Sequence, residues 1–119
     1  MGSNSTSTEP VLDFDSALSR LGGDRELFAD MAGYLVEDAP KLFDSLRIAI
    51  AAQDAAAVRM AAHALKGLLA GSGGVRSVNV AQELEDAGHS GDLSQAPTLA
   101  ASLESELSQL KAALAEHLR

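Results

Sequence analysis

The 119-residue sequence contains no cysteine and no tryptophan, and aromatic residues make up only 3% of it. The lack of cysteine excludes disulfides, thiolate metal sites and thiol catalysis. Basic residues are also few: Lys and Arg number 9 against 17 Asp and Glu, so the net charge is −8. An acidic chain repels phosphate backbones and anionic lipids, which argues against nucleic-acid or membrane binding. No apolar run approaches the roughly 18 residues that would span a membrane.

Alanine and leucine dominate instead, with 22 and 18 residues. This composition favours helix and disfavours strand, and no segment alternates in the manner of a strand. The length fits a single domain that folds without covalent links. Residues 1–10 are small and polar, so we expect a disordered tail or cloning remnant there, followed by one domain over residues 11–119.

Helical periodicity and end signals divide the first half of this domain. A short helix is expected over Val11–Leu21, ended by Gly22-Gly23. Asp24 then begins a second helix. Because proline lacks an N–H and fits the first turn of a helix, we expect Pro40 to end the second helix and begin the next.

The second half carries clearer signals. Asp54 is a good N-cap, and the glycine-rich run at residues 71–74 ends the helix that it begins. A further helix ends near Gly88 or Gly91, and Pro97 marks the start of the last one. Amphipathic helices joined by short loops predict an all-α fold, an antiparallel up-down four-helix bundle with the short first helix across one end.

The helix after Asp54 has an unusual outer face. At about 100° per residue, His63 lies roughly 160° from the core-facing Leu65. Gly67 follows His63 at i+4, where it removes a side chain at a cost of about 1 kcal/mol relative to Ala. Lys66 lies at i+3. A buried glycine or a solvated histidine is ordinary when found alone, but together these residues predict a site open to a large partner.

Antiparallel pairing about residues 71–74 brings the next helix to His63 near residue 84, within reach of Gln82 or Glu85. A carboxylate or amide oxygen there would accept the Nδ1–H of the imidazole and leave the Nε2 lone pair free to act as a nucleophile. Lys66 would then favour a phosphoryl group beside the ring. That Glu85 is a plain surface acid is an equally good interpretation of the sequence.

The run Ala62-His63-Ala64-Leu65-Lys66-Gly67 resembles the His-x-Leu-Lys-Gly signature of histidine-containing phosphotransfer (HPt) domains. Further blocks at residues 18–24, 28–40 and 84–92 resemble the family in the same order. The sequence departs from the family at Leu68, where serine is common and where the helical wheel points to the core. It also departs at Gly71-Ser72-Gly73, where Asn-Leu-Gly is common.

The resemblance implies a phosphorelay intermediate on a four-helix bundle. His63 would accept a phosphoryl group from the aspartyl phosphate of one receiver domain and pass it to the Asp of another, with no kinase activity of its own. The expected partners are response-regulator receiver domains and a sensor or hybrid histidine kinase. We expect no cofactor on this chain, Mg²⁺ on the partner receiver domain, and a cytoplasmic monomer.

The surface around His63 is expected to dock these partners through an apolar rim. We expect Arg59 to contribute to this rim, although the sequence fits a solvated surface cation equally well. A binding-only adaptor that never carries phosphate is the alternative function. A metal or hydrolytic site is disfavoured because His89 and His117 do not pair with His63 or each other at i, i+3 or i+4. The expected rim residues are Leu18, Leu21, Ala56, Met60, Gly67 and Ala70.

Overall fold

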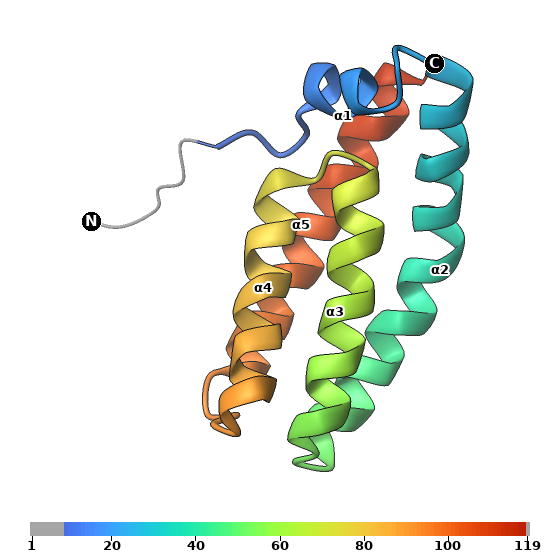
Figure 1. Ribbon diagram of the computed structural model, residues 1–119. Coiled ribbons are helices and arrows are strands. Elements are labelled where there is room, and N and C mark those ends of the chain that lie inside the picture. Colours follow the sequence, from blue (N-terminus) through green and yellow to red (C-terminus); the bar gives the residue numbers. More distant parts are fainter. Residues whose placement is uncertain (1–8, 119) are drawn as a thin grey trace.

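The computed structural model describes residues 9–118, and every regular element within them is a helix. Four long helices run alternately up and down, and the short α1 lies across one end of them (Figure 1). The predicted all-α bundle with a capping helix is therefore confirmed. Most of the predicted tail, residues 1–8, lies outside the described residues. The helices are α1 (Phe14–Arg20), α2 (Arg25–Ala51), α3 (Ala55–Gly71), α4 (Val75–Ser90) and α5 (Ala96–His117).

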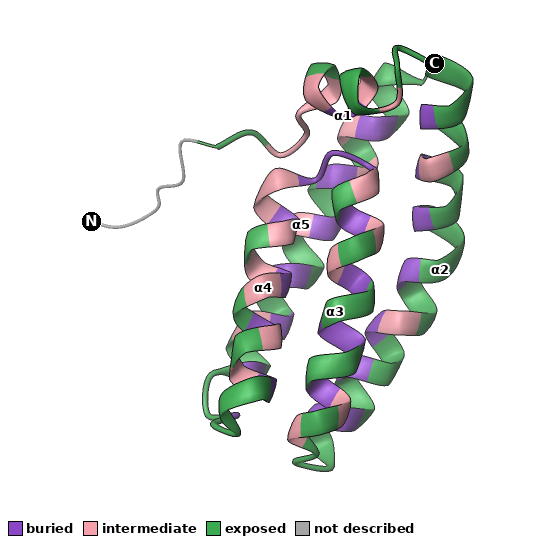
Figure 2. Ribbon diagram, in the orientation of Figure 1, coloured by how far each residue is buried: buried purple, intermediate pink, exposed green. Residues whose placement is uncertain are grey.

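The four long helices form a ring in which each packs against the next, and α5 closes it against α2. The α3–α4 seam and the α2–α5 seam are therefore opposite edges of the bundle. Buried residues form one stripe along the inner side of each long helix (Figure 2). In α5 the stripe repeats every three or four residues, as a bundle core requires; it comprises Ala96, Ala100, Leu103, Leu107, Leu110 and Leu114.

Aspartate caps begin three of the five helices. The Asp24 carboxylate accepts a hydrogen bond from the Leu27 amide at 3.0 Å, and Asp54 accepts one from the Ala57 amide at 3.1 Å. Asp13 caps α1 in the same way through Ser16. Such caps satisfy amides that have no partner within the helix and contribute about 1 kcal/mol each. The starts predicted at Asp24 and Asp54 are therefore confirmed.

The predicted break at Pro40 was wrong, because α2 continues through it for 27 residues. Proline there removes one hydrogen bond and costs about 3 kcal/mol in a helix interior. The buried positions Ala39 and Phe43 stay in phase across Pro40, whose own ring is exposed. Burying large side chains such as Phe43 and Leu46 contributes about 1.5–3 kcal/mol each, which offsets the loss.

The apolar residues in the first half of α2 divide between the core and the surface. Leu27 and Tyr34 follow the helical period together with Phe28 and Leu35, but they are 40% and 54% exposed. The buried positions of this segment are Phe28, Ala32 and Leu35. The buried stripe of α2 is therefore narrower than the apolar spacing alone indicates.

Helix α1 is tied to the loop between α3 and α4. The Asp13 amide donates to the Gly73 carbonyl at 2.9 Å, and the Arg20 guanidinium donates to the Ala70 carbonyl at 3.2 Å. Gly73 has φ of +77°, a conformation that glycine adopts freely, and a Cβ there would lie 3.0 Å from the Ala17 side chain. The residues Gly71-Ser72-Gly73, where the sequence departs from the family pattern, thus form a compact loop against which α1 packs. Ser72 in this loop is fully buried.

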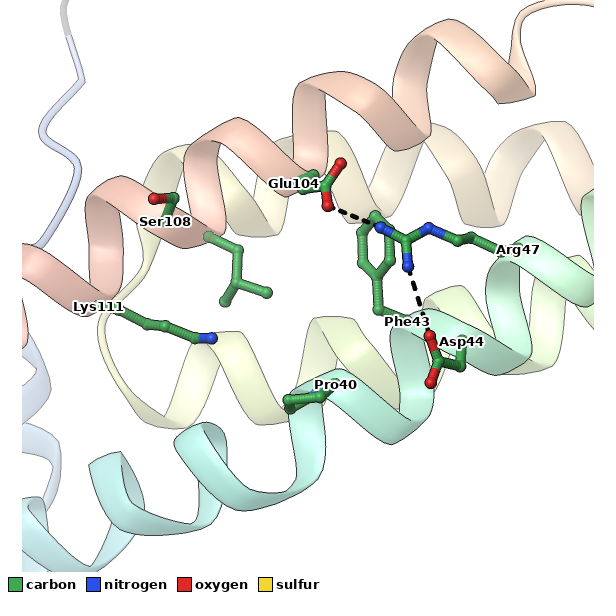
Figure 3. Close-up of a pocket in the computed structure, with 8 residues that line it drawn as sticks. Pro40, Phe43, Asp44, Arg47, Glu104, Ser108 and Lys111 are labelled. Carbon is green, nitrogen blue, oxygen red and sulfur yellow. Dashed lines mark hydrogen bonds and ion pairs between the residues drawn. The ribbon is translucent and has the colours of Figure 1, made fainter.

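The α2–α5 seam is the least closed part of the ring and carries a groove of about 360 Å³ (Figure 3). Among the charged side chains that line it, Arg47 pairs with both Asp44 and Glu104. The Arg47 guanidinium pairs with Glu104 at 2.6 Å and lies over the Phe43 ring, 4.5 Å from its centroid. The Arg47–Glu104 pair links α2 to α5. None of the helices in the described part of the chain is long and apolar enough to cross a membrane.

Candidate functional site

His63 lies near the middle of α3 on its outward face, and its side chain is 70% exposed. No acidic residue occurs anywhere in α3, so the ring is flanked along its own helix only by small, apolar or basic groups. The Met60 side chain is 67% exposed one turn before it. Along α3 the accessible imidazole therefore has only small, apolar or basic neighbours, on an otherwise acidic protein.

Glu85 reaches His63 from α4. The His63 Nδ1 lies 3.2 Å from the Glu85 Oε2, and the two residues are 22 positions apart in the sequence. Antiparallel packing of α3 against α4 across the loop at residues 72–74 brings them level. A carboxylate accepts only, so it holds the neutral ring in the tautomer with hydrogen on Nδ1. In that tautomer Nε2 carries the lone pair, on a side chain that is 70% exposed.

Lys66 lies in the same seam. Its Nζ is 2.7 Å from the Glu85 Oε1 and donates to the Gln82 Oε1 at 3.0 Å. The Lys66 side chain is 25% exposed and that of Glu85 is 20% exposed. Of the two candidates for contact with His63, Glu85 is therefore the one at the imidazole, while Gln82 binds Lys66.

The ion pair shifts the acidity of Glu85. The hydrogen bond from the Lys66 ammonium holds the pKa of the Glu85 carboxyl below its ordinary value, and the contact with His63 acts in the same direction. Partial burial opposes these effects without cancelling them. Glu85 is thus a carboxylate at neutral pH, the form that can accept a hydrogen bond from the Nδ1–H of His63.

The α3 positions of the predicted docking surface lie on the same outward face of the helix as His63. A Cβ built on Gly67 would meet no atom within 4 Å, so no close packing inside the protein requires glycine there. Leu18 in α1 and Leu21, its C-cap residue, are half-buried and pack against the core. The hydrogen bond from Arg20 to the Ala70 carbonyl places the end of α1 beside the end of α3. The remaining α3 positions of the predicted surface are all exposed: Ala56, Arg59, Met60, Gly67 and Ala70.

Comparison with known proteins agrees with this geometry. The sequence model of the Hpt domain family matches residues 30–113, a region that contains His63 and both of its polar neighbours, Lys66 and Glu85. The chain belongs to the Hpt domain family. Hpt proteins carry out histidine phosphotransfer in two-component phosphorelays, where they interact with receiver domains and histidine kinases.

One solved structure is closely similar to this Hpt domain: histidine-containing phosphotransfer protein B (HptB) from Pseudomonas aeruginosa PAO1. The two share 27% sequence identity with a TM-score of 0.83, and the match covers 92% of this chain and 96% of that one. Among curated protein sequences, none matches the chain significantly.

The other two histidines of the Hpt domain lie elsewhere. The His117 ring stacks on Phe14 at 4.5 Å between centroids, which anchors α1 on the end of α5. His89 is exposed in the last turn of α4. In residues 9–118, no group of three or more His, Asp or Glu side chains is placed to hold a metal ion.

Sequence reasoning passed over one residue of the α3–α4 seam, Asp86. Asp86 accepts from the Gln82 Nε2 at 2.8 Å, a contact that its i+4 spacing on α4 could have indicated. Leu68, predicted to point into the core, is half-buried and packs against the core at its margin.

Proposed function

We propose that His63 is the phosphoryl acceptor of this Hpt domain and that it relays the group from one receiver domain to another. The supporting observation is the exposed imidazole, whose Nδ1 contacts Glu85 and whose Nε2 is left free. The Nε2 lone pair attacks the phosphorus of an aspartyl phosphate. The N–P bond forms as the P–O bond to the aspartate breaks, and the aspartate leaves as a carboxylate. Attack by the Asp of a second receiver domain reverses the same step.

Glu85 and Lys66 support this exchange in different ways. When Nε2 bonds to phosphorus, the ring with its Nδ1–H becomes cationic, and the Glu85 carboxylate stabilises that charge. Lys66 lies on the adjacent turn, where its ammonium favours the phosphoryl group. This chain binds no cofactor in the proposed reaction, since the receiver domain supplies Mg²⁺ and most of the charge stabilisation. Lys66→Ala should therefore slow transfer without abolishing it.

We further propose that receiver domains dock on the outward face of α3 and the adjoining end of α1. Small or apolar exposed positions around His63 allow a large partner to approach the imidazole closely. Arg59 and Lys66 supply positive charge toward an acidic receiver site. The protein would act as a cytoplasmic monomer downstream of a sensor or hybrid histidine kinase, without kinase activity of its own. The docking residues are Leu18, Leu21, Ala56, Arg59, Met60, Gly67 and Ala70.

The deciding experiment incubates the protein with a panel of phosphorylated receiver domains. We expect acid-labile, base-stable label on the wild type and none on His63→Gln, whose circular dichroism and thermal unfolding should match the wild type. Label that then moves to a second receiver domain would establish the relay. If no receiver domain labels folded wild-type protein, yet one still binds it and His63→Ala equally, the protein is a binding-only adaptor.

A further inference from the structure

The contacts around His63 extend one step beyond the residues assigned above. Lys66 bonds to Gln82, and Gln82 bonds to Asp86, so a chain of four contacts joins Asp86 to His63. The Asp86–Gln82 contact is 2.8 Å long and the Gln82–Lys66 contact 3.0 Å. The Lys66–Glu85 contact is 2.7 Å long and the Glu85–His63 contact 3.2 Å.

The direction of each link is set by chemistry. An ammonium only donates and a carboxylate only accepts. Gln82 therefore must turn its amide oxygen to Lys66, and its NH₂ then points to Asp86. With Asp86 in place, the opposite amide orientation would set the Gln82 oxygen against a carboxylate and its NH₂ against an ammonium. Asp86 thus selects the orientation of Gln82 that can bind Lys66.

At the other end of this series of contacts, Lys66 and His63 both contact the Glu85 carboxylate. The carboxylate offers one oxygen to Lys66 and the other to His63. His63 is 70% exposed and bonds to no other side chain in the described residues, so its tautomer depends on where the Glu85 Oε2 is held. Gln82, Glu85 and Asp86 lie on adjacent turns of α4, a rigid base for this arrangement.

We propose that Gln82 and Asp86 are positioning residues: they hold Lys66 on one oxygen of Glu85 and thereby keep the other oxygen on Nδ1 of His63. Removing either lets the Lys66 side chain leave the seam and the Glu85 carboxylate rotate. The expected consequence is a larger share of the His63 tautomer with hydrogen on Nε2, which has no lone pair for attack. For phosphotransfer this role rests on the function proposed above.

The test measures the tautomer directly by ¹⁵N NMR of the His63 ring nitrogens at a pH where the ring is neutral. Asp86→Ala and Gln82→Leu should both raise the Nε2–H share. Asp86→Asn should restore the wild-type pattern, because its amide oxygen still accepts from Gln82. Glu83→Ala is the matched control, because it removes an exposed acid next to Gln82 in α4. It should leave the tautomer ratio of His63 unchanged.

Phosphotransfer rates give the second readout. Asp86→Ala should slow transfer by about 2- to 10-fold, the equivalent of one net hydrogen bond, and Asp86→Asn should not. Unchanged ring nitrogen shifts in both Asp86→Ala and Gln82→Leu would overturn the proposal. Because the NMR readout needs no phosphate, that result is distinct from a failure of the wild type to accept label, which would overturn the proposed function alone.

Discussion

The Lys66 Nζ lies 2.7 Å from the Glu85 Oε1, an ion pair that joins α3 to α4 beside His63. The two residues come from different helices and are both largely shielded from solvent. Such a pair is less screened than one on an open surface. It therefore affects both the stability of the α3–α4 seam and the charge that the imidazole meets.

Stability should depend on the protonation of Glu85. Its pKa is lower in the folded protein than the ordinary value of 4.5, chiefly through the hydrogen bond from Lys66. The unfolded chain then takes up the proton first as the pH falls. The contribution of Glu85 to the free energy of unfolding is present above pH 4.5 and is lost as the pH falls through the folded pKa.

Urea unfolding of the wild type and Glu85→Gln checks this expectation. The wild type should be the more stable protein at neutral pH, and the difference should shrink below pH 4.5. Glu83→Gln serves as the control for a general loss of one negative charge from α4. A difference between wild type and Glu85→Gln that stays constant with pH would show that the ion pair does not act as described.

Substitutions at Gly67 should affect the stability of the fold and phosphotransfer differently. Because no atom lies within 4 Å of a Cβ at this position, Gly67→Ala should raise the free energy of unfolding by up to about 1 kcal/mol through helix propensity. Gly67→Glu should stay folded yet block transfer from receiver domains, through its bulk and its charge beside the phosphoryl group. Thermal unfolding and transfer assays measure the two effects, and normal transfer by Gly67→Glu would contradict the docking surface.

Gly88 should behave in the opposite way. A Cβ there would lie 2.6 Å from the Arg59 backbone nitrogen and 2.8 Å from the Ala55 carbonyl oxygen. Backbone atoms cannot move aside cheaply, so Gly88→Ala should destabilise the protein by about 1–3 kcal/mol. Chemical denaturation beside Gly67→Ala makes a matched pair of helical glycines. Equal stability of the two variants would mean that α3 and α4 are not so closely packed.

Pro40 should lower the stability of α2. Pro40→Ala restores an N–H that can donate to the Val36 carbonyl and removes the ring from the helix interior. Since Pro40 is exposed, nothing in the core is lost. We expect a gain of about 1–3 kcal/mol in the free energy of unfolding, with phosphotransfer unchanged. A loss of stability in urea denaturation would instead show that proline at this position stabilises α2.

Local sequence signals were sufficient where the physics is local. An Asp side chain caps the helix that begins next to it, so the starts of α2 and α3 followed from Asp24 and Asp54. The single apolar stripe of α3 likewise identified its core face and placed His63 on the opposite side. The end of α2 could not be predicted in this way, because the stability that carries the helix through Pro40 comes from burial against other helices.

Pairing between helices was only partly predictable. Antiparallel packing about a short loop placed residues 82–85 near His63, but the choice between Gln82 and Glu85 needed the rotation of α4 about its axis. The same rotation decides that Lys66 bonds to both of them and that Asp86 orients Gln82. Neither helix encodes its rotation in its own periodicity to within one residue, since one position turns a helix by about 100°.

The sequence by itself determined the all-α class, the exposure of His63 and the resemblance to Hpt domains, because helix propensity, apolar spacing and a short signature act over a few residues. Only the tertiary structure distinguished Gly67, which faces open space, from Gly88, which meets the backbone of α3. Only it brought Glu85 to the imidazole. These features depend on the distances between helices. Packing of the whole core sets those distances, so they cannot be read from any single segment of the sequence.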